Sequence, residues 1–163
     1  MIRLYYDLEK TMQQQYDLAA LVLKEAQKQN QALRKNDLAA INACVAGLEQ
    51  LGLKMRELDQ NREEITVRLA EQINLSPDVK LTEIAARAPE DLSFRLLYLR
   101  REIRRCLEEL KEQVEFNNLL TRNAMRFNNM MLGIFRQAAG ATYGNSGQLK
   151  DGAGFGAALN KSV

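Results

Sequence analysis

Apolar residues recur at alternating steps of three and four along three long stretches of this sequence, which limits these stretches to amphipathic helices. The first stripe runs from Leu4 to Leu33, and the second runs from Leu38 to Ile73. The third stripe, from Leu92 to Ala138, is the longest, and no glycine interrupts it before Gly133. No segment alternates like a β-strand, so we predict an all-α protein.

The connections between the stripes predict how the helices are arranged. Asp37 can cap a helix that begins directly after it, so the first two helices should form a tight hairpin. Pro77 disfavours continuation of the second helix, and a short turn of helix is expected at residues 81–88. Pro89 favours a new helix start. We therefore predict an elongated antiparallel coiled-coil bundle of three long helices over residues 1–139.

Residues 140–163 differ in composition from the predicted bundle. They hold six of the nine glycines, so we predict that they form a flexible C-terminal tail. Tyr143, Phe155 and Leu159 interrupt this tail and could act as anchors that become ordered on binding. For Phe155 and Leu159, the alternative is a flexible end without a binding role.

The sequence offers little for catalysis or metal binding. It contains no histidine, which removes the most frequent general base and metal ligand. Adjacent carboxylates such as Glu63 and Glu64 lie in charged stretches, where exposure to solvent explains them. Cys44 and Cys106 are isolated, and we expect them to be buried as small apolar residues. We predict no catalytic residue, no metal and no cofactor.

The charge distribution argues against nucleic acid and membrane partners. The net charge of +2 gives no strong basic surface. Arginines cluster only in "LRREIRRC", where nearby glutamates indicate a salt-bridged helix face; an RNA- or DNA-binding stripe is the alternative. No stretch approaches the length of a membrane span, and the first residues lack an apolar signal segment, so we predict a cytoplasmic protein.

The end of the third helix is the strongest candidate for a binding surface. This helix is longer than the second, so residues 127–139 should extend past the hairpin without a partner helix. Methionine side chains in this stretch would adapt to a docked helix. The predicted binding residues are Phe127, Met130, Met131, Ile134, Phe135 and Ala138. The alternatives are that the tail or a second chain covers this stripe.

Asn117 occupies a position of the third stripe where an apolar residue is expected. A polar residue at such a position can set the register of a helix bundle at a cost in stability. We predict that Asn117 finds a polar partner on another helix.

Several motifs resemble the FlgN family of flagellar export chaperones. They are "LTEIAARAPE", "NNLLTRNAMRFNNMMLGIF" and "ATYGNSG". The most specific elements are Asn-x-x-Leu at Asn117–Leu120 and Thr-Tyr-Gly-x-x-Gly at Thr142–Gly147, and the likeness covers nearly the whole chain.

This resemblance implies a function that composition does not. FlgN-like proteins bind hook-filament junction proteins in the cytoplasm, keep their C-terminal helical segments from associating early, and deliver them to the membrane export gate of the flagellar type III apparatus. The resemblance also places client binding in the C-terminal part of the chain, where the exposed stripe is predicted. Tyr143 and the other tail anchors would contact the client or the export gate. The alternative is a homodimeric structural or adaptor coiled-coil protein.

Overall fold

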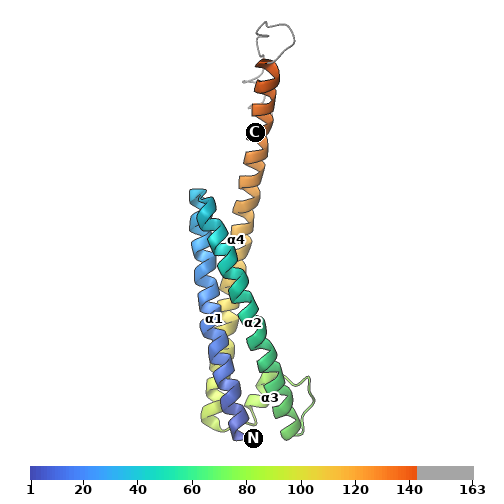
Figure 1. Cartoon of the computed structure of the whole chain (residues 1–163). Helices are drawn as coiled ribbons and strands as arrows, with labels where there is room; N and C mark the ends of the chain where they lie inside the picture. The colour runs from blue at the N-terminus through green and yellow to red at the C-terminus, as the bar shows by residue number, and fades with distance from the viewer. Residues whose placement is uncertain (143–163) are drawn as a thin grey trace. The chain divides into compact units, whose positions relative to one another are not determined.

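The computed structural model describes the backbone of residues 1–142 and the side chains of residues 1–134. Four helices form this part of the chain: α1 (Ile2–Lys35), α2 (Leu38–Gln72), α3 (Leu81–Ala85) and α4 (Glu90–Thr142) (Figure 1). No strand occurs among these residues, so the predicted all-α class is confirmed. The prediction of three helices is incomplete, because α3 forms a fourth helix at the predicted short turn. Coiled-coil packing of the long helices stays a prediction.

The chain divides into two compact units, Met1–Leu119 and Leu120–Val163. The first unit contains α1, α2, α3 and the beginning of α4, whereas the second begins within α4. The predicted division between a bundle at 1–139 and a tail at 140–163 stays a prediction. The backbone of α4 is helical as far as Thr142.

The turn between α1 and α2 follows directly from two polar residues. Asn36 adopts a left-handed conformation, with φ 53° and ψ 36°, which asparagine tolerates better than most residues. Backbone amides close the end of α1, since Asn36 N donates to Leu33 O at 3.2 Å and Asp37 N to Ala32 O at 3.0 Å. The carboxylate of Asp37 accepts a hydrogen bond from Ala40 N at 3.0 Å, which confirms the predicted cap.

Side-chain contacts show that α1 and α2 run in opposite directions. Gln15 Nε2 donates to Asp59 Oδ1 at 3.3 Å, and Asn61 Nδ2 donates to Thr11 Oγ1 at 3.2 Å. Residue numbers therefore fall along α1 as they rise along α2. The predicted hairpin is confirmed.

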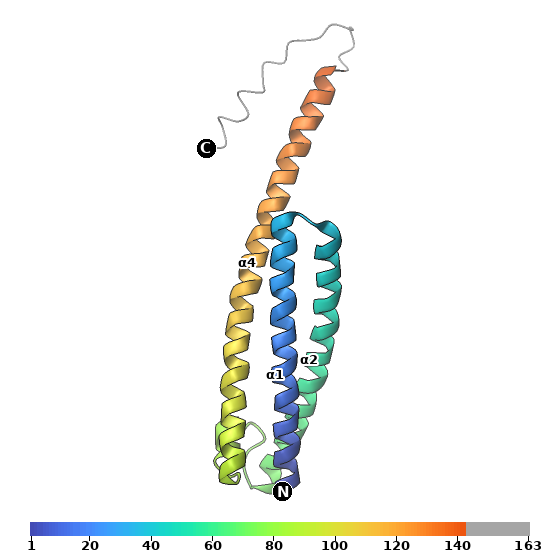
Figure 2. The ribbon, with the colours of Figure 1, turned by 90° about the vertical axis from the view of Figure 1, so that its left-hand side faces the viewer.

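The beginning of α4 runs in the same direction as α1. Arg95 pairs with Glu9 at 3.1 Å, and Asn30 Nδ2 donates to Asn117 Oδ1 at 2.9 Å, so the numbers rise together on the two helices. Figure 2 shows α1 between α2 and the first part of α4. Within the first unit, α1 therefore contacts both of the other long helices.

The most deeply buried side chains lie where α3 joins the three long helices. Tyr5 is 1% exposed, and its hydroxyl donates to Ile84 O at 3.3 Å. Full burial of each large apolar side chain stabilises the fold by about 1.5–3 kcal/mol. The core cluster consists of Leu4, Tyr5, Leu8, Met12, Ile65, Leu69, Ile84, Ala85, Leu92, Leu96 and Leu99.

The predicted second stripe is buried only over part of α2. Ile65 and Leu69 belong to the core, but Leu38 is 70% and Val45 40% exposed. Near the hairpin, the buried face passes through Cys44 instead of Val45. The prediction that the second stripe, from Leu38 to Ile73, faces the packed interior was therefore wrong at Leu38 and Val45, because the small thiol side chain of Cys44 faces inward beside Glu25 of α1.

Candidate partner-binding surfaces

The part of α4 that belongs to the second unit exposes several apolar side chains. The exposed fractions are 60% for Met125, 57% for Phe127, 45% for Met130 and 53% for Leu132. Exposure of this many large apolar side chains on one segment is typical of a protein interaction site.

Helical geometry separates these residues into two faces. Phe127, Met130, Met131 and Ile134 follow the spacing i, i+3, i+4 and i+7, so at about 100° per residue they lie within an arc of about 100° on the helix. Met131 and Ile134 are half-buried. Met125 and Leu132 lie about 150° around the helix from Phe127. These four predicted client-binding residues therefore share one face, while Met125 and Leu132 belong to another.

The structure does not describe the side chains of the other predicted binding residues. The side chains of Phe135 and Ala138 lie outside the described residues. The predicted tail anchors Tyr143, Phe155 and Leu159 also lie outside them.

Asn117 lies at the centre of a buried polar network in the first unit. Its Nδ2 donates to Ala26 O at 2.8 Å and to Gln29 Oε1 at 3.0 Å. Its Oδ1 accepts from Asn30 Nδ2 at 2.9 Å and from Gln113 Nε2 at 3.0 Å. Asn117 is only 3% exposed. The prediction that Asn117 has a polar partner on another helix is confirmed.

This network favours one register between α4 and α1, in which Asn117 lies beside Ala26, Gln29 and Asn30. A shift of α4 by one turn would separate the buried amide of Asn30 from its acceptor, and a buried polar group without a partner costs free energy. Asn30 was missed in the sequence because it lies beside the first stripe, not on it. The only signal in the sequence was the adjacent polar pair Gln29 and Asn30, together with the polar residue Asn117 in the third stripe.

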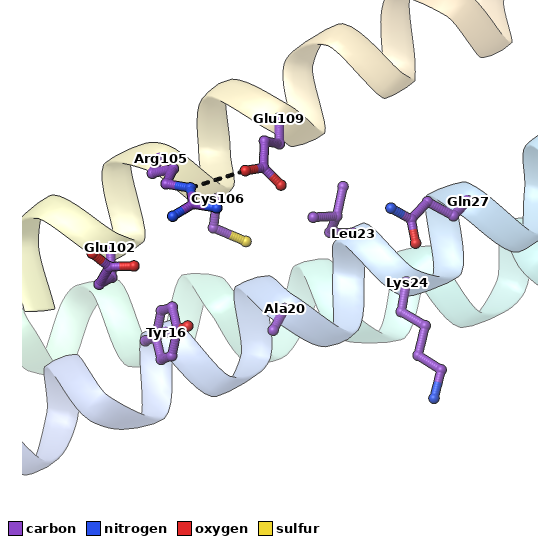
Figure 3. Close-up of a pocket in the computed structure, with 9 residues that line it drawn as sticks. All are labelled: Tyr16, Ala20, Leu23, Lys24, Gln27, Glu102, Arg105, Cys106 and Glu109. Carbon is purple, nitrogen blue, oxygen red and sulfur yellow. Dashed lines mark hydrogen bonds and ion pairs between the residues drawn. The ribbon is translucent and has the colours of Figure 1, made fainter.

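A hollow of about 490 Å³ lies between α1 and the first part of α4 (Figure 3). Charged side chains dominate its α4 side, where Arg105 pairs with Glu109 at 3.1 Å. Cys106 points toward α1, and burial raises the pKa of its thiol. A protonated thiol is a weak nucleophile. This hollow therefore offers no activated group for covalent catalysis.

Cysteines and arginines elsewhere agree with structural roles. Cys44 and Cys106 are free and buried, as predicted. No cluster of three potential ligands (His, Cys, Asp or Glu) suited to a metal ion occurs among the described residues. Three of the clustered arginines have carboxylate partners at 3.1–3.3 Å, in the pairs Arg101–Glu102, Arg104–Glu108 and Arg105–Glu109. This pairing supports a salt-bridged, solvated helix face.

Comparison with protein families decides what kind of protein carries these surfaces. The family model described as FlgN protein matches residues 1–151 of the chain. The chain belongs to the FlgN family. FlgN proteins are flagellar export chaperones and not enzymes. No curated protein and no solved structure matches this FlgN chain.

The family match spans both buried and exposed features of the chain. It includes the Asn117 network, the exposed face around Phe127 and the Thr142–Gly147 motif. Within the described residues of this FlgN protein, no helix has the length and apolar character needed to cross a membrane.

Proposed function

We propose that this protein is a cytoplasmic chaperone of the flagellar type III export system whose clients are hook-filament junction proteins. It binds their C-terminal helical segments, prevents premature association and delivers them to the membrane export gate. Membership of the FlgN family supports the general role. The exposed apolar face of α4 supports the choice of binding surface.

The binding face consists of Phe127, Met130, Met131 and Ile134, continued by Phe135 and Ala138. Anchors at i, i+3, i+4 and i+7 match those with which one amphipathic helix packs against another. Phe127 is 57% and Met130 45% exposed, so docking of a client helix would remove their apolar surface from water. The thioethers of Met130 and Met131 allow clients of different shape to pack on the same face.

Tyr143, Phe155 and Leu159 are proposed to contact either the bound client or the export gate. Flexible segments with few apolar anchors can wrap a partner and become ordered at that moment. The Thr142–Gly147 motif within the family match supports a role for Tyr143.

Isothermal titration tests the proposal directly. We expect a C-terminal helical peptide from a hook-filament junction protein to bind the full-length chain saturably, with an increase in helical circular dichroism. No binding at peptide concentrations of about 1 mM, where even weak specific complexes form, would contradict the proposed client.

Sedimentation velocity distinguishes the proposed chaperone function from the alternative, a homodimeric adaptor. A second copy could cover the same apolar face, so a dimer that resists dissociation by client peptide would favour the adaptor. We expect a concentration-independent sedimentation coefficient for the free protein, or a dimer that the peptide dissociates.

A further inference from the structure

An open groove lies between α2 and the first part of α4, entirely within the first unit. Its volume is about 850 Å³. Met12 of α1 forms part of the floor, and Met55, Ile103 and Leu107 contribute apolar surface from the two walls. Leu107 is 47% exposed. The apolar side chains of the two walls belong to the predicted stripes or lie beside these stripes. No helix of the described residues covers these side chains.

The position of α3 explains why the groove opens here. Ile84 and Ala85 of α3 are fully buried in the core cluster. At the end of the bundle where α3 connects α2 to α4, α3 therefore covers the core. Leu81, the first residue of α3, already lines the groove. Past Leu81 along the bundle, no further helix of the described residues packs against α2 and α4. The groove is therefore open at a place where another helix could pack between them.

The groove is also electropositive. Its charged residues have a net charge of +3, from five cations and two anions: Arg56, Arg62, Arg100, Arg104, Lys111, Asp59 and Glu108. Both carboxylates form ion pairs within the groove: Asp59 pairs with Arg62 at 2.7 Å, and Glu108 pairs with Arg104 at 3.3 Å.

Three cations of the groove are left without such a pair. Among the described residues, Arg56, Arg100 and Lys111 have no carboxylate partner within ion-pair distance. A partner with acidic side chains at the two edges would satisfy them.

The dimensions of the groove indicate the size of its occupant. Its walls extend from Gly52 to Arg62 and from Arg100 to Lys111, which corresponds to about 16 Å of helix at about 1.5 Å per residue. A Cβ atom added at Gly52 would meet no atom within 4 Å, so a partner backbone can approach this wall closely.

We propose that this groove docks one amphipathic helix of a partner protein, about three turns long, with an apolar stripe flanked by acidic residues. The partner completes a four-helix arrangement with α1, α2 and α4. This site is distinct from the client-binding face of α4 and does not depend on that assignment.

Two other occupants fit the groove poorly. Residues 143–163 contain Lys150, Lys161 and Asp151 as their only charged side chains, so they do not supply acidic edges. Their many glycines also disfavour a helix. A second copy docked groove to groove would bring Arg56, Arg100 and Lys111 of both chains together and cause repulsion.

Fluorescence anisotropy with a designed peptide tests the proposal on the full-length chain. The probe is a labelled helix of about 14 residues with leucines at i, i+3, i+4 and i+7 and glutamates on both sides. A scrambled peptide of the same composition lacks the stripe, and a second control carries lysines in place of the glutamates. We expect binding of the acidic amphipathic peptide alone, with an affinity that falls as salt is added.

Variants of the protein locate the site. Arg100→Glu should weaken peptide binding at least about tenfold, whereas Arg68→Glu, an exposed arginine outside the groove, should change it less than about twofold. Gly52→Phe should block the wall and also weaken binding about tenfold, whereas Leu53→Phe, at a position outside the groove, should not. Met131→Asp with Ile134→Asp should leave this peptide's affinity unchanged, which separates the groove from the client face.

Cross-linking identifies the occupant even if one charge variant fails to fold. A photoreactive benzoylphenylalanine replaces Leu107, and the products are mapped by mass spectrometry. Cross-links to the acidic peptide support the proposal. Cross-links only to residues 143–163 or to a second copy overturn it, as does equal binding of the scrambled peptide or unchanged affinity in both Arg100→Glu and Gly52→Phe.

Discussion

Among single residues, Asn117 shows how one buried amide can define the position of a helix. Its side-chain amide forms hydrogen bonds with Ala26, Gln29 and Asn30 on α1 and with Gln113 on its own helix. An apolar side chain at this position would pack at several levels of α1, but the amide is satisfied at one. We infer that Asn117 contributes more to the register of α4 than to its net stability.

We expect Asn117→Leu to lower the free energy of unfolding by about 1–3 kcal/mol, because Asn30 Nδ2 would remain buried without its acceptor. From the sequence alone, we would expect Asn117→Leu to stabilise the fold or to loosen its structural specificity. Urea unfolding of Asn117→Leu, Asn30→Leu and the double variant measures the coupling, with Asn118→Leu as the exposed control. If the double variant loses the sum of the two single losses, the amides are not coupled.

Gly52 lies in the interior of α2, where glycine normally weakens a helix. Since an added Cβ would meet no atom within 4 Å, Gly52→Ala should raise the free energy of unfolding by about 0.5–1 kcal/mol. Gly47→Ala provides the matched comparison, because its Cβ would lie 3.4 Å from Glu25 Oε1. Thermal and urea unfolding of both variants should show the larger gain in stability for Gly52→Ala. A loss of stability in Gly52→Ala would mean that other atoms of the protein occupy the space beside Gly52.

The buried thiols should make stability depend on alkaline pH. Burial first, and the nearby Glu25 carboxylate second, raise the pKa of Cys44; burial raises the pKa of Cys106. A raised pKa in the folded state means that their contribution is complete below the unfolded pKa of about 8.5 and is lost as pH rises through the folded pKa.

Urea unfolding between about pH 8 and pH 10 should therefore show a steeper loss of stability for the native chain than for Cys44→Ala with Cys106→Ala. The thiols should also react slowly with a disulfide reagent until the protein unfolds. Equal pH slopes for the two proteins would show that the thiols do not titrate with folding.

Among the helices, α2 is packed unevenly along its length. Leu69 is fully buried in the core cluster, whereas Leu58 is only half-buried and lines a hollow between α1 and α2. The apolar spacing of the two residues is the same, so the sequence pattern does not distinguish them. Burial differs because α3 adds Ile84 and Ala85 near Leu69.

We expect Leu69→Ala to cost about 2–5 kcal/mol and Leu58→Ala clearly less, because only Leu69 leaves an enclosed cavity. Chemical unfolding of the two variants measures this difference. Equal losses would mean that Leu58 is as enclosed as Leu69.

For the molecule as a whole, local signals in the sequence predicted the helices well. Asp37 and Pro89 fixed two helix starts, because capping and proline geometry act over a few residues. The exposure of Leu38 and the partners of Asn117 could not be predicted, since they depend on which face of α1 each helix meets. The groove required knowledge of how far α3 covers the bundle. The client face was proposed from sequence and family resemblance.

The most direct measurement compares two faces of α4 in one calorimetric titration with a hook-filament junction peptide. Met131→Asp with Ile134→Asp changes the proposed client face, while Met125→Asp with Leu132→Asp introduces the same charges about 150° away. We expect the first variant to lose client binding and the second to retain it, with nearly native helicity and melting in both. Unchanged affinity in the first variant, or an equal loss in both, would contradict client binding through the Phe127–Ile134 face.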